Sequence, residues 1–457
     1  MSQTAPVATA TITAPMPLPQ ESTQHCDVLV IGAGPAGSTA AAMLAARGRN
    51  VVLIEKERHP RFHIGESLLP RNLAVLERLG LRDAVAKIGV FKPGAEFVSD
   101  ENGKSVAFNF ANGLDHQYTF SYQVRRSSFD EILFRNAQSK GANTLEETRV
   151  TEVTLGEGGG RSAVVAESAD GTIHRFAPRY VLDASGRDTF MANKLRSKES
   201  NKTNNTAAVY GHFTGVEYRT GDMEGYITVH LTEDGWFWMI PIDNEVMSVG
   251  FVGMPQAFRG RTQDGGTGDM TEFFEQRIAR SPTVSARMKH AVRQGRVTST
   301  GNYSYNSRFV GGDGYMMIGD AYAFIDPVFS SGVLLAMTTG EAGADIAGAW
   351  LENRAEGIRL AHASERRVRR MMGALSWLII RINTPELRSM FMNPSEKFRM
   401  RAAVVSILAG NLDGMKQSRL PLFLFKTAFY FQVLLRKLGV KLPENGGIMQ
   451  TEHATAS

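Results

Sequence analysis

The chain has 457 residues, of which 43% are hydrophobic and 21% are charged, so it can bury a large core and is too long for one simple domain. Its net charge of +5 is uneven, because residues 357–442 carry 16 Lys/Arg against 4 Asp/Glu. No zinc-finger, homeodomain or aromatic-basic platform accompanies these charges, which argues against nucleic acid as a partner. The basic segment favours an acidic partner, such as a carrier protein or anionic lipid, although a solvated helix face also explains it.

The cysteine content and the chain ends bear on location. The single cysteine, Cys26, cannot form a disulfide within the chain and fits the reducing cytoplasm, where we expect this protein. Residues 1–25 lack a basic and an apolar region, so they predict a disordered tail rather than a signal peptide, and residues 446–457 predict a second tail. The apolar stretch over residues 420–442 is broken by proline and charged residues. It predicts no spanning helix but an amphipathic one, for which peripheral membrane contact stays open.

The first predicted elements after the tail form one βαβ unit. Residues 27–31 read as a buried strand, residues 35–47 as an alanine-rich helix and residues 50–55 as a second strand. Further helices are predicted over residues 66–88, 128–140, 331–351 and much of 360–440. Further strands are predicted over residues 94–122, 147–183, 206–253 and 315–318, and a polar mobile loop over residues 260–269.

This order of elements predicts an α/β fold in which two domains are interleaved. A Rossmann-type cofactor domain would comprise residues 26–93, 123–204 and 291–351. An antiparallel β-sheet domain for the substrate would comprise residues 94–122 and 205–290. A C-terminal helical appendage would occupy residues 352–445.

A glycine-rich turn follows the first strand directly. Gly32, Gly34, Ala36 and Gly37 belong to this turn, and Glu55 ends the second strand. Glycines at these positions permit a tight turn and close approach of the backbone to a pyrophosphate, while the helix N-terminus adds partial positive charge. The Glu55 carboxylate can accept hydrogen bonds from a ribose diol. We therefore predict a dinucleotide site, with an ordinary glycine turn as the lesser alternative.

Two later segments each place glycine and aspartate at a strand end. They are Val181-Leu-Asp183-Ala-Ser-Gly186-Arg187 and Met317-Ile-Gly319-Asp320-Ala321. With the glycine turn, they resemble the large family of FAD-dependent monooxygenases, reductases and halogenases, which favours FAD over NAD. The resemblance implies that Asp183 and Gly186 lie at the cofactor, that Asp320 binds its ribityl chain and that Arg126 lies nearby. Taken singly, each segment could be a simple turn.

A tryptophan pair narrows the resemblance. Trp236-Phe-Trp238-Met-Ile-Pro241 matches the WxWxIP signature of flavin-dependent halogenases. Alternate residues of a strand face one side, so both indoles share a face. The resemblance implies that this face separates the flavin from the organic substrate and prevents direct oxygen transfer, which gives Trp236 and Trp238 a catalytic role. Without the resemblance, packing in the hydrophobic core would be sufficient to explain both tryptophans.

The loop before the helix at 331–351 matches a second halogenase pattern, FxxPxxSxG, as Phe324-Ile-Asp-Pro327-Val-Phe-Ser-Ser331-Gly332. Because a helix begins here, the amides of Ser331 and Gly332 point outward at the positive end of the helix dipole. Such a nest suits a chloride or bromide ion beside the flavin, with Pro327 and Gly332 also contacting the cofactor. Related hydroxylases and reductases carry a similar loop that only seats the flavin, which remains the alternative.

The stretch Phe91-Lys92-Pro-Gly-Ala-Glu-Phe97 resembles the KxGAxF segment that carries the catalytic lysine of halogenases acting on phenols or carrier-bound substrates. An ammonium can hydrogen-bond hypohalous acid, and an amine deprotonated by burial can become a haloamine. Seen alone, Lys92 would be a solvated surface residue. Glu66 and Ser67, after Gly65, also match the halogenase pattern and are expected near the flavin, whereas His63 has only a packing or solvent role.

One position departs from the tryptophan halogenases, which carry a glutamate where this chain has Phe329. The departure argues against free tryptophan and favours a phenol or a carrier-tethered pyrrole as substrate. The resemblance implies a halogenase that uses reduced FAD, O2 and halide, and no metal, to make hypohalous acid. Because the chain has one dinucleotide fingerprint, a separate flavin reductase is the predicted partner.

Three other functions remain open at this point. The same fold could serve an FAD-dependent aromatic monooxygenase, which needs its substrate against the flavin. It could also serve an isoprenoid reductase, which needs neither oxygen nor halide, or a non-catalytic flavoprotein.

Overall fold

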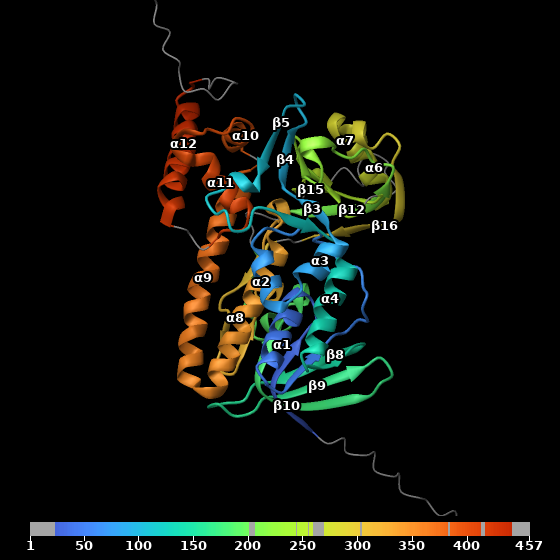
Figure 1. Ribbon diagram of the computed structural model, residues 1–457, viewed down its shortest axis with the longest axis vertical. Helices are drawn as coiled ribbons and strands as arrows, with labels where there is room; N and C mark the ends of the chain where they lie inside the picture. Colours follow the sequence, from blue (N-terminus) through green and yellow to red (C-terminus); the bar gives the residue numbers. More distant parts are fainter. Residues whose placement is uncertain are drawn as a thin grey trace, which may run out of the picture.

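The structure is a computed structural model that describes residues 23–440 except 201–205, 244, 255, 259–268, 302–303, 383 and 413–415. In Figure 1, strands and long helices form the lower half, a second sheet with two small helices lies at the upper right, and short helices lie at the upper left. The first 22 residues, the predicted C-terminal tail and most of the predicted polar loop lie outside the described residues. The predicted N-terminal tail extends to residue 25, but the first strand already begins at Gln24, so the predicted end of the tail is slightly too late.

The first sheet is mainly parallel, with the order β18-β19-β10-β1-β2-β7. β1 pairs in parallel with β2 and β10, and β10 with β19, so the carboxyl ends of these strands lie at one edge. The antiparallel hairpin of β8 and β9 continues the sheet beside β10. The strands are β1 (Gln24–Ile31), β2 (Val51–Ile54), β7 (Asn143–Leu145), β8 (Thr148–Thr154), β9 (Ala163–Ser168), β10 (Ile173–Asp183), β18 (Gly311–Gly312) and β19 (Tyr315–Met317).

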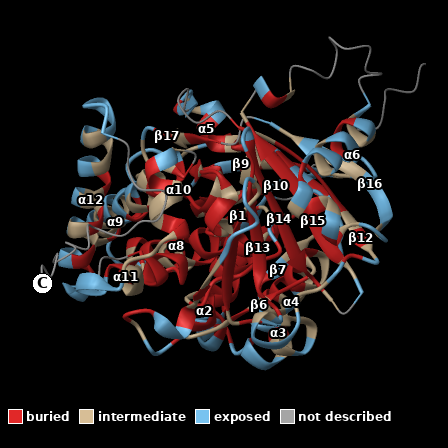
Figure 2. Ribbon diagram, turned by 90° about the horizontal axis from the view of Figure 1, so that it is seen from above, coloured by how far each residue is buried: buried red, intermediate tan, exposed pale blue. Residues whose placement is uncertain are grey.

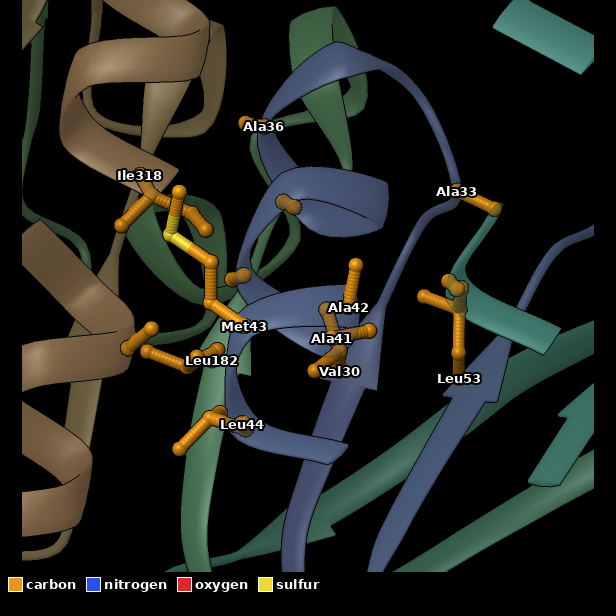
Figure 3. Close-up of a cluster of buried hydrophobic side chains, with 14 of the residues drawn as sticks. Val30, Ala33, Ala36, Ala41, Ala42, Met43, Leu44, Leu53, Leu182 and Ile318 are labelled. Carbon is orange, nitrogen blue, oxygen red and sulfur yellow. The ribbon is translucent and has the colours of Figure 1, made fainter. Parts of the chain in front are cut away.

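Helix α1 (Pro35–Ala46) is packed on every side. All of its residues except the last are buried, as expected for a helix that is apolar all round. Figure 3 shows its side chains among Val30 and Leu53 of the sheet, Leu182 of β10 and Ile318. α4 (Arg126–Ser139) and α8 (Gly332–Glu352) pack beside it. Because alanine and glycine carry little side chain, α1 and α8 approach closely, which fixes the N-terminus of α1 against the strand ends.

The second sheet has the order β16-β12-β15-β14-β13-β4-β5. It differs from the predicted antiparallel sheet in one pair, since β13 and β4 are parallel. The predicted domain boundary at residue 290 also differs, because β16 pairs with β12 and so belongs to this sheet. The strands are β4 (Gly94–Ser99), β5 (Ser105–Asn109), β12 (Ala207–Thr214), β13 (Ile227–Leu231), β14 (Gly235–Pro241), β15 (Met247–Gly253) and β16 (Val292–Thr300).

The two faces of β14 serve different cores. Phe237 and Met239 face the side covered by α6 (Met270–Arg280) and α7 (Pro282–Arg287), where they pack with Phe273 and Phe274. Trp236 and Trp238 face the opposite side, where a second core continues into the C-terminal helices. This alternation follows from the two-residue period of a strand and confirms that the two indoles share a face.

The C-terminal helices cover that second core. They are α9 (Arg354–Arg381), α10 (Pro385–Met392), α11 (Met400–Leu408) and α12 (Arg419–Lys437). Figure 2 shows that the central strands are buried while α9 and α12 expose their outer sides. None of the helices in the described residues combines the length and the apolar character needed to cross a bilayer.

Short elements complete the chain. The helix predicted over residues 66–88 is two helices, because Gly80 leaves the helical region with a φ of 74°. These helices are α2 (Asn72–Leu79) and α3 (Arg82–Ile88), and α5 (Phe190–Lys194) follows β10. Two small sheets pair β3 (Val90–Lys92) with β6 (Ser121–Gln123), and β17 (Tyr305–Ser307) with β11 (Lys198–Ser200) and β20 (Ala323–Phe324).

The close approach of α1 and α8 can be tested at Gly340. A Cβ there would lie 2.4 Å from the carbonyl oxygen of Ala36, a backbone atom that cannot rotate away. We expect Gly340→Ala to lower the free energy of unfolding by about 1–3 kcal/mol, measured by denaturant unfolding. The control is Gly373→Ala on α9, where a Cβ meets nothing within 4 Å and the helix should be unchanged or stabilised. Equal stability of both variants would contradict the predicted packing.

Candidate cofactor and active site

A cavity of about 460 Å³ lies where the strand ends of the first sheet meet the indole face of the second. This volume is in the usual range for a cofactor or ligand site, and open α/β sheets bind ligands beyond the carboxyl ends of their strands. Of the predicted site residues, those in the cavity wall are Gly32, Gly34, Ala36, Glu55, Glu66, Ser67, Arg126, Gly186, Trp236, Trp238, Asp320, Pro327 and Gly332. Lys92, Ser331, Gly37 and Asp183 are not in the wall.

Glycine is required at the three positions of the turn for different structural reasons. Gly32 has a φ of +94°, and a Cβ there would lie 2.4 Å from the carbonyl oxygen of Ala184. At Gly37, a Cβ would lie 1.9 Å from the carbonyl oxygen of Gly32, so this glycine lets the helix pack on the turn. Gly34 instead faces open space, with only the Arg61 Nη2 at 3.7 Å. The turn thus keeps one stretch of bare backbone open toward a ligand.

A chain of ion pairs joins the end of β2 to α4. The Glu55 Oε2 accepts a hydrogen bond of 2.8 Å from the Ala33 amide and lies 3.4 Å from the Arg61 Nη2. Arg61 also pairs with Asp130 at 3.2 Å, and Arg126 pairs with the same carboxylate at 2.8 Å. Burial alone would raise the pKa of Asp130, but the two guanidinium groups lower it. Glu55 is therefore fixed at the cavity wall with lone pairs left for a ribose hydroxyl.

Arg126 holds the loop that precedes Glu66. Its Nη1 donates a hydrogen bond of 2.6 Å to the carbonyl oxygen of Ile64, and Gly65 follows with a φ of +105°. A Cβ at Gly65 would lie 3.0 Å from the same Nη1. The spacing of Arg126 and Asp130, one helical turn apart, is the sequence signal for this clamp.

The two predicted aspartates have different positions. Asp320 lies in the cavity wall, where burial raises the pKa of its carboxyl to about 6 although Arg126 and Arg187 oppose the shift. Asp183 is fully buried, and its oxygens accept hydrogen bonds from the amides of Ser185 at 2.9 Å and Met191 at 2.7 Å. Asp183 therefore shapes the loop after β10, and its expected place at the cofactor stays a prediction.

The tryptophan pair forms one wall of the cavity. The ring centroids of Trp236 and Trp238 are 5.9 Å apart, and both side chains are buried. Trp238 donates a hydrogen bond of 3.1 Å from its Nε1 to the Ser248 Oγ. Its ring lies over Gly250 of the neighbouring strand, where a Cβ would come within 2.2 Å of the indole. The absence of a side chain at Gly250 therefore leaves the space that the Trp238 ring occupies.

The loop before α8 carries polar atoms without partners. Ser330 has a φ of 56°, and Asp326 caps the turn before it through the Val328 amide at 3.2 Å. Ser331 is 1% exposed, and its Oγ has no hydrogen-bond partner within the described residues. A Cβ at Gly332 would meet nothing within 4 Å, so its backbone is open to the cavity. Buried polar groups normally have partners, so this helix start is suited to a ligand.

Lys92 is almost completely buried, although it is not in the cavity wall. It is 1% exposed, its Nζ donates a hydrogen bond of 2.8 Å to the carbonyl oxygen of Leu68, and it lies 5.3 Å from the ring centroid of Phe110. Burial alone lowers the pKa of this amine to about 7. Leu68 directly follows Ser67, which is in the cavity wall. Lys92 thus lies behind the wall, on the side of the aromatic core.

Several residues in or next to the wall were missed in the sequence. His212 of β12 is not in the wall but supports it, since its Nε2 lies 2.7 Å from the Oε1 of the wall residue Glu66, whose second oxygen has no partner in the described residues. Tyr210 lines the cavity, with its ring centroid 5.8 Å from that of Trp238. Arg61 lines it as well. The alternation of Tyr210 and His212 along one strand is the signal that could have identified them as neighbours.

The residues present fit a bound FAD. Backbone is open at Gly34, Gly186 and Gly332, and a carboxylate stands at Glu55 for a ribose and at Asp320 for a ribityl chain. Trp236 and Trp238 add an aromatic part to the cavity wall. These features together match a ligand with a diphosphate, two polyol parts and a flat ring.

Known proteins agree with this site. The chain matches the family described as FAD binding domain over residues 25–377. It is 36% identical over 312 residues to tryptophan 2-halogenase of Chondromyces crocatus, which covers 68% of this chain and 58% of that protein. It is 30% identical over 339 residues to 1H-pyrrole-2-carbonyl-(peptidyl-carrier protein) chlorinase of Pseudomonas fluorescens, which covers 68% of this chain and 73% of that protein.

A solved structure supports the same relationship. The myxobacterial chondrochloren halogenase CndH is 29% identical, with a TM-score of 0.73 over 88% of this chain and 97% of that one. The chain spans 58 to 65% of the length of several curated halogenases that it matches. It therefore belongs to the flavin-dependent halogenase family, within the larger group of proteins that carry the FAD binding domain.

Proposed function

We propose that this chain halogenates an electron-rich aromatic compound, using reduced FAD, O2 and halide. The observation that carries the proposal is a pair of buried indoles in the wall of the cofactor cavity, together with a buried lysine that is hydrogen-bonded to Leu68, the residue next to Ser67 of the same wall. An aromatic monooxygenase needs its substrate against the flavin, and the wall opposes such contact. The division into a cofactor domain, a substrate domain and a C-terminal helical region, with β16 assigned to the substrate domain, belongs to the same proposal. So do a cytoplasmic location and the supply of reduced flavin by a separate reductase.

FAD would be held by the glycine turn at Gly34, by Glu55 and by Asp320. When bound and reduced, it supplies the chemistry by which O2 oxidises halide to hypohalous acid. Ser331 and Gly332 would hold the halide, since their end of α8 offers free amides and an unpartnered hydroxyl. Trp236 and Trp238 would keep the organic substrate away from the flavin ring.

Lys92 would pass the halogen to the substrate. Because burial brings its pKa to about 7, much of the amine is neutral near neutral pH and can act as a nucleophile. Its nitrogen would attack the halogen of hypohalous acid, giving a haloamine and water. The aromatic ring would then take the halogen and lose a proton, which restores the amine. The hydrogen bond to Leu68 orients the nitrogen through both steps.

The aromatic side chains around Phe329 favour a substrate whose ring carries no separate charged group. Phe329 stands where tryptophan halogenases carry glutamate, and it stacks on Phe391 of α10 with ring centroids 6.1 Å apart. Phe97 and Phe108 complete the cluster. We infer a phenol or a carrier-tethered pyrrole as acceptor. One relative is named for a carrier-bound pyrrole and another for tryptophan, and both names describe electron-rich rings.

The role of Lys92 can be tested by Lys92→Met, which keeps the length and apolar stem but removes the amine. With reduced FAD, O2, bromide and a phenolic probe, we expect halogenated product to fall at least about a hundredfold, because no group passes the halogen. The amount of halogenated product should fall similarly in Lys92→Arg, which keeps the charge but offers no neutral amine. Bound FAD and far-UV circular dichroism should match the parent. Undiminished halogenation in Lys92→Met would contradict the proposal.

The neutral amine also predicts a pH dependence. Since the pKa of Lys92 is lowered to about 7, the charged form dominates below that value and the neutral form above it. The rate of halogen transfer should therefore rise about tenfold from pH 6 to pH 8, following the fraction of free amine. Halide oxidation has a pH dependence of its own, which must be removed from the measured rate. It is obtained from Lys92→Met, by trapping the hypohalous acid that this variant releases with a soluble probe at each pH. A corrected rate that falls with pH would instead indicate that the ammonium is the active form.

The position of the indole wall can be tested at Gly250. Gly250→Ala places a Cβ against the Trp238 ring, so we expect the ring to shift and the share of oxidant that reaches the organic substrate to drop. The measurement is halogenated product per reduced FAD consumed, together with tryptophan fluorescence. Gly211→Ala on β12 is the control, because the atom nearest to a Cβ there would be in the Phe213 ring at 3.5 Å, an ordinary van der Waals contact. An unchanged yield in both variants would argue against the wall.

A further inference from the structure

Helix α12 has two apolar faces, and the residues that the structure describes cover only one of them. Its buried residues are Pro421, Phe425 and Phe429, which face α9 and the neighbouring helices. A second row projects from the opposite side with exposed fractions of 51 to 69%, formed by Leu420, Phe423, Phe431, Leu434 and Leu438. At about 100° per residue, these positions share one side of the helix. A water-exposed helix face is normally polar, so this row requires a cover.

A second exposed aromatic group lies beside the row. Phe398 is 70% exposed, and it stands in the turn Lys397–Arg399 that packs against α12. Phe398 and Arg399 have φ angles of 54° and 58°, a region that side-chain-bearing residues rarely adopt. The backbone is thus held in a costly shape that presents a phenylalanine between two basic residues. Such strain is typical of contact sites.

The charges around the row have one sign. The helix Arg419–Lys437 contains no acidic residue, and Arg419, Lys426 and Lys437 lie along one edge of the apolar row. Within the described part of the chain, none of these three pairs with a carboxylate, whereas Arg436 pairs with Glu386 at 2.9 Å. Lys426 lies over the Trp377 ring, 5.1 Å from its centroid, but this contact does not neutralise its charge, so the basic edge favours an anionic partner. The basic edge also opposes a second copy of this chain, whose equivalent face would bring like charges together.

The shape of the surface favours a bilayer over a protein groove. α12 lies at the outer edge of the molecule in both views (Figure 1 and Figure 2). Its 19 residues extend about 28 Å, so the row is long, narrow and convex. Aromatic and aliphatic groups on one side with lysine and arginine at the edge are the pattern of a helix that lies in a membrane interface.

We propose that α12 and the Lys397–Arg399 turn bind peripherally to an anionic lipid surface. Phe423 and Phe431 would enter the boundary of head groups and acyl chains, while the basic edge would contact lipid phosphates. This inference goes beyond the proposed halogenation and does not rest on it. It would place the enzyme beside substrates that partition into, or are carried at, a membrane.

The experiment is sedimentation of the FAD-loaded full chain with vesicles. We expect at least about tenfold more binding to phosphatidylcholine vesicles containing phosphatidylglycerol than to phosphatidylcholine alone, with a decrease as salt is raised. The double variant Phe423→Ser with Phe431→Ser should lose at least about tenfold of that binding. Val292→Ser removes an apolar side chain that is 60% exposed on β16, far from this surface in sequence, and should bind like the parent.

The outcomes separate the alternatives. Unchanged FAD content, circular dichroism and halogenation of a soluble probe in the double variant would show that the fold and active site are intact. No sedimentation of the parent with anionic vesicles at low salt would overturn the proposal. It would also be overturned if light scattering shows a dimer that the double variant abolishes, or if the same residues bind an acidic carrier protein while vesicles do not bind.

Discussion

The proposed separation of two reaction sites by buried aromatic rings is the constraint that links the parts of this site. In the proposed reaction, an oxidant made at the flavin would attack whatever lies nearest, so the organic acceptor has to be kept apart from it. Trp236 and Trp238 would provide this barrier, because one strand presents both indoles to the same side. Gly250 on the neighbouring strand leaves the space that the Trp238 ring occupies.

The barrier is useful only if the two sheets are fixed relative to each other. The ion pairs of Arg61 and Arg126 with Asp130 hold the loop between β2 and Glu66, and His212 connects Glu66 to the second sheet. Such buried pairs are costly to break, because removing one partner leaves an uncompensated charge. The loop therefore acts as a joint between the cofactor domain and the wall. Lys92 lies just beyond it, bound to the carbonyl oxygen of Leu68.

Much of this arrangement could be predicted from local sequence. The turn at Gly32 to Gly37 and the alternation of Trp236 with Trp238 are short-range patterns, and the structure has them as expected. Long-range contacts were harder to predict. Asp183 follows a strand as a cofactor ligand would, yet backbone amides of its own loop occupy its oxygens. Likewise, the pairing of β16 with β12 depends on strand partners that a linear pattern does not contain.

The burial of Lys92 could not be predicted from the sequence either, because an isolated lysine is usually solvated. The residues that surround Lys92 come from three separate segments of the chain. Its burial makes halogen transfer across the indole wall the central claim. The most direct test supplies isotopically labelled O2 to the reduced enzyme with an aromatic acceptor, with and without bromide, and measures the products by mass spectrometry. The account predicts brominated product without label, and no oxygenated product when bromide is absent. Label incorporated into the acceptor ring would contradict it, because oxygen would then have passed directly from the cofactor.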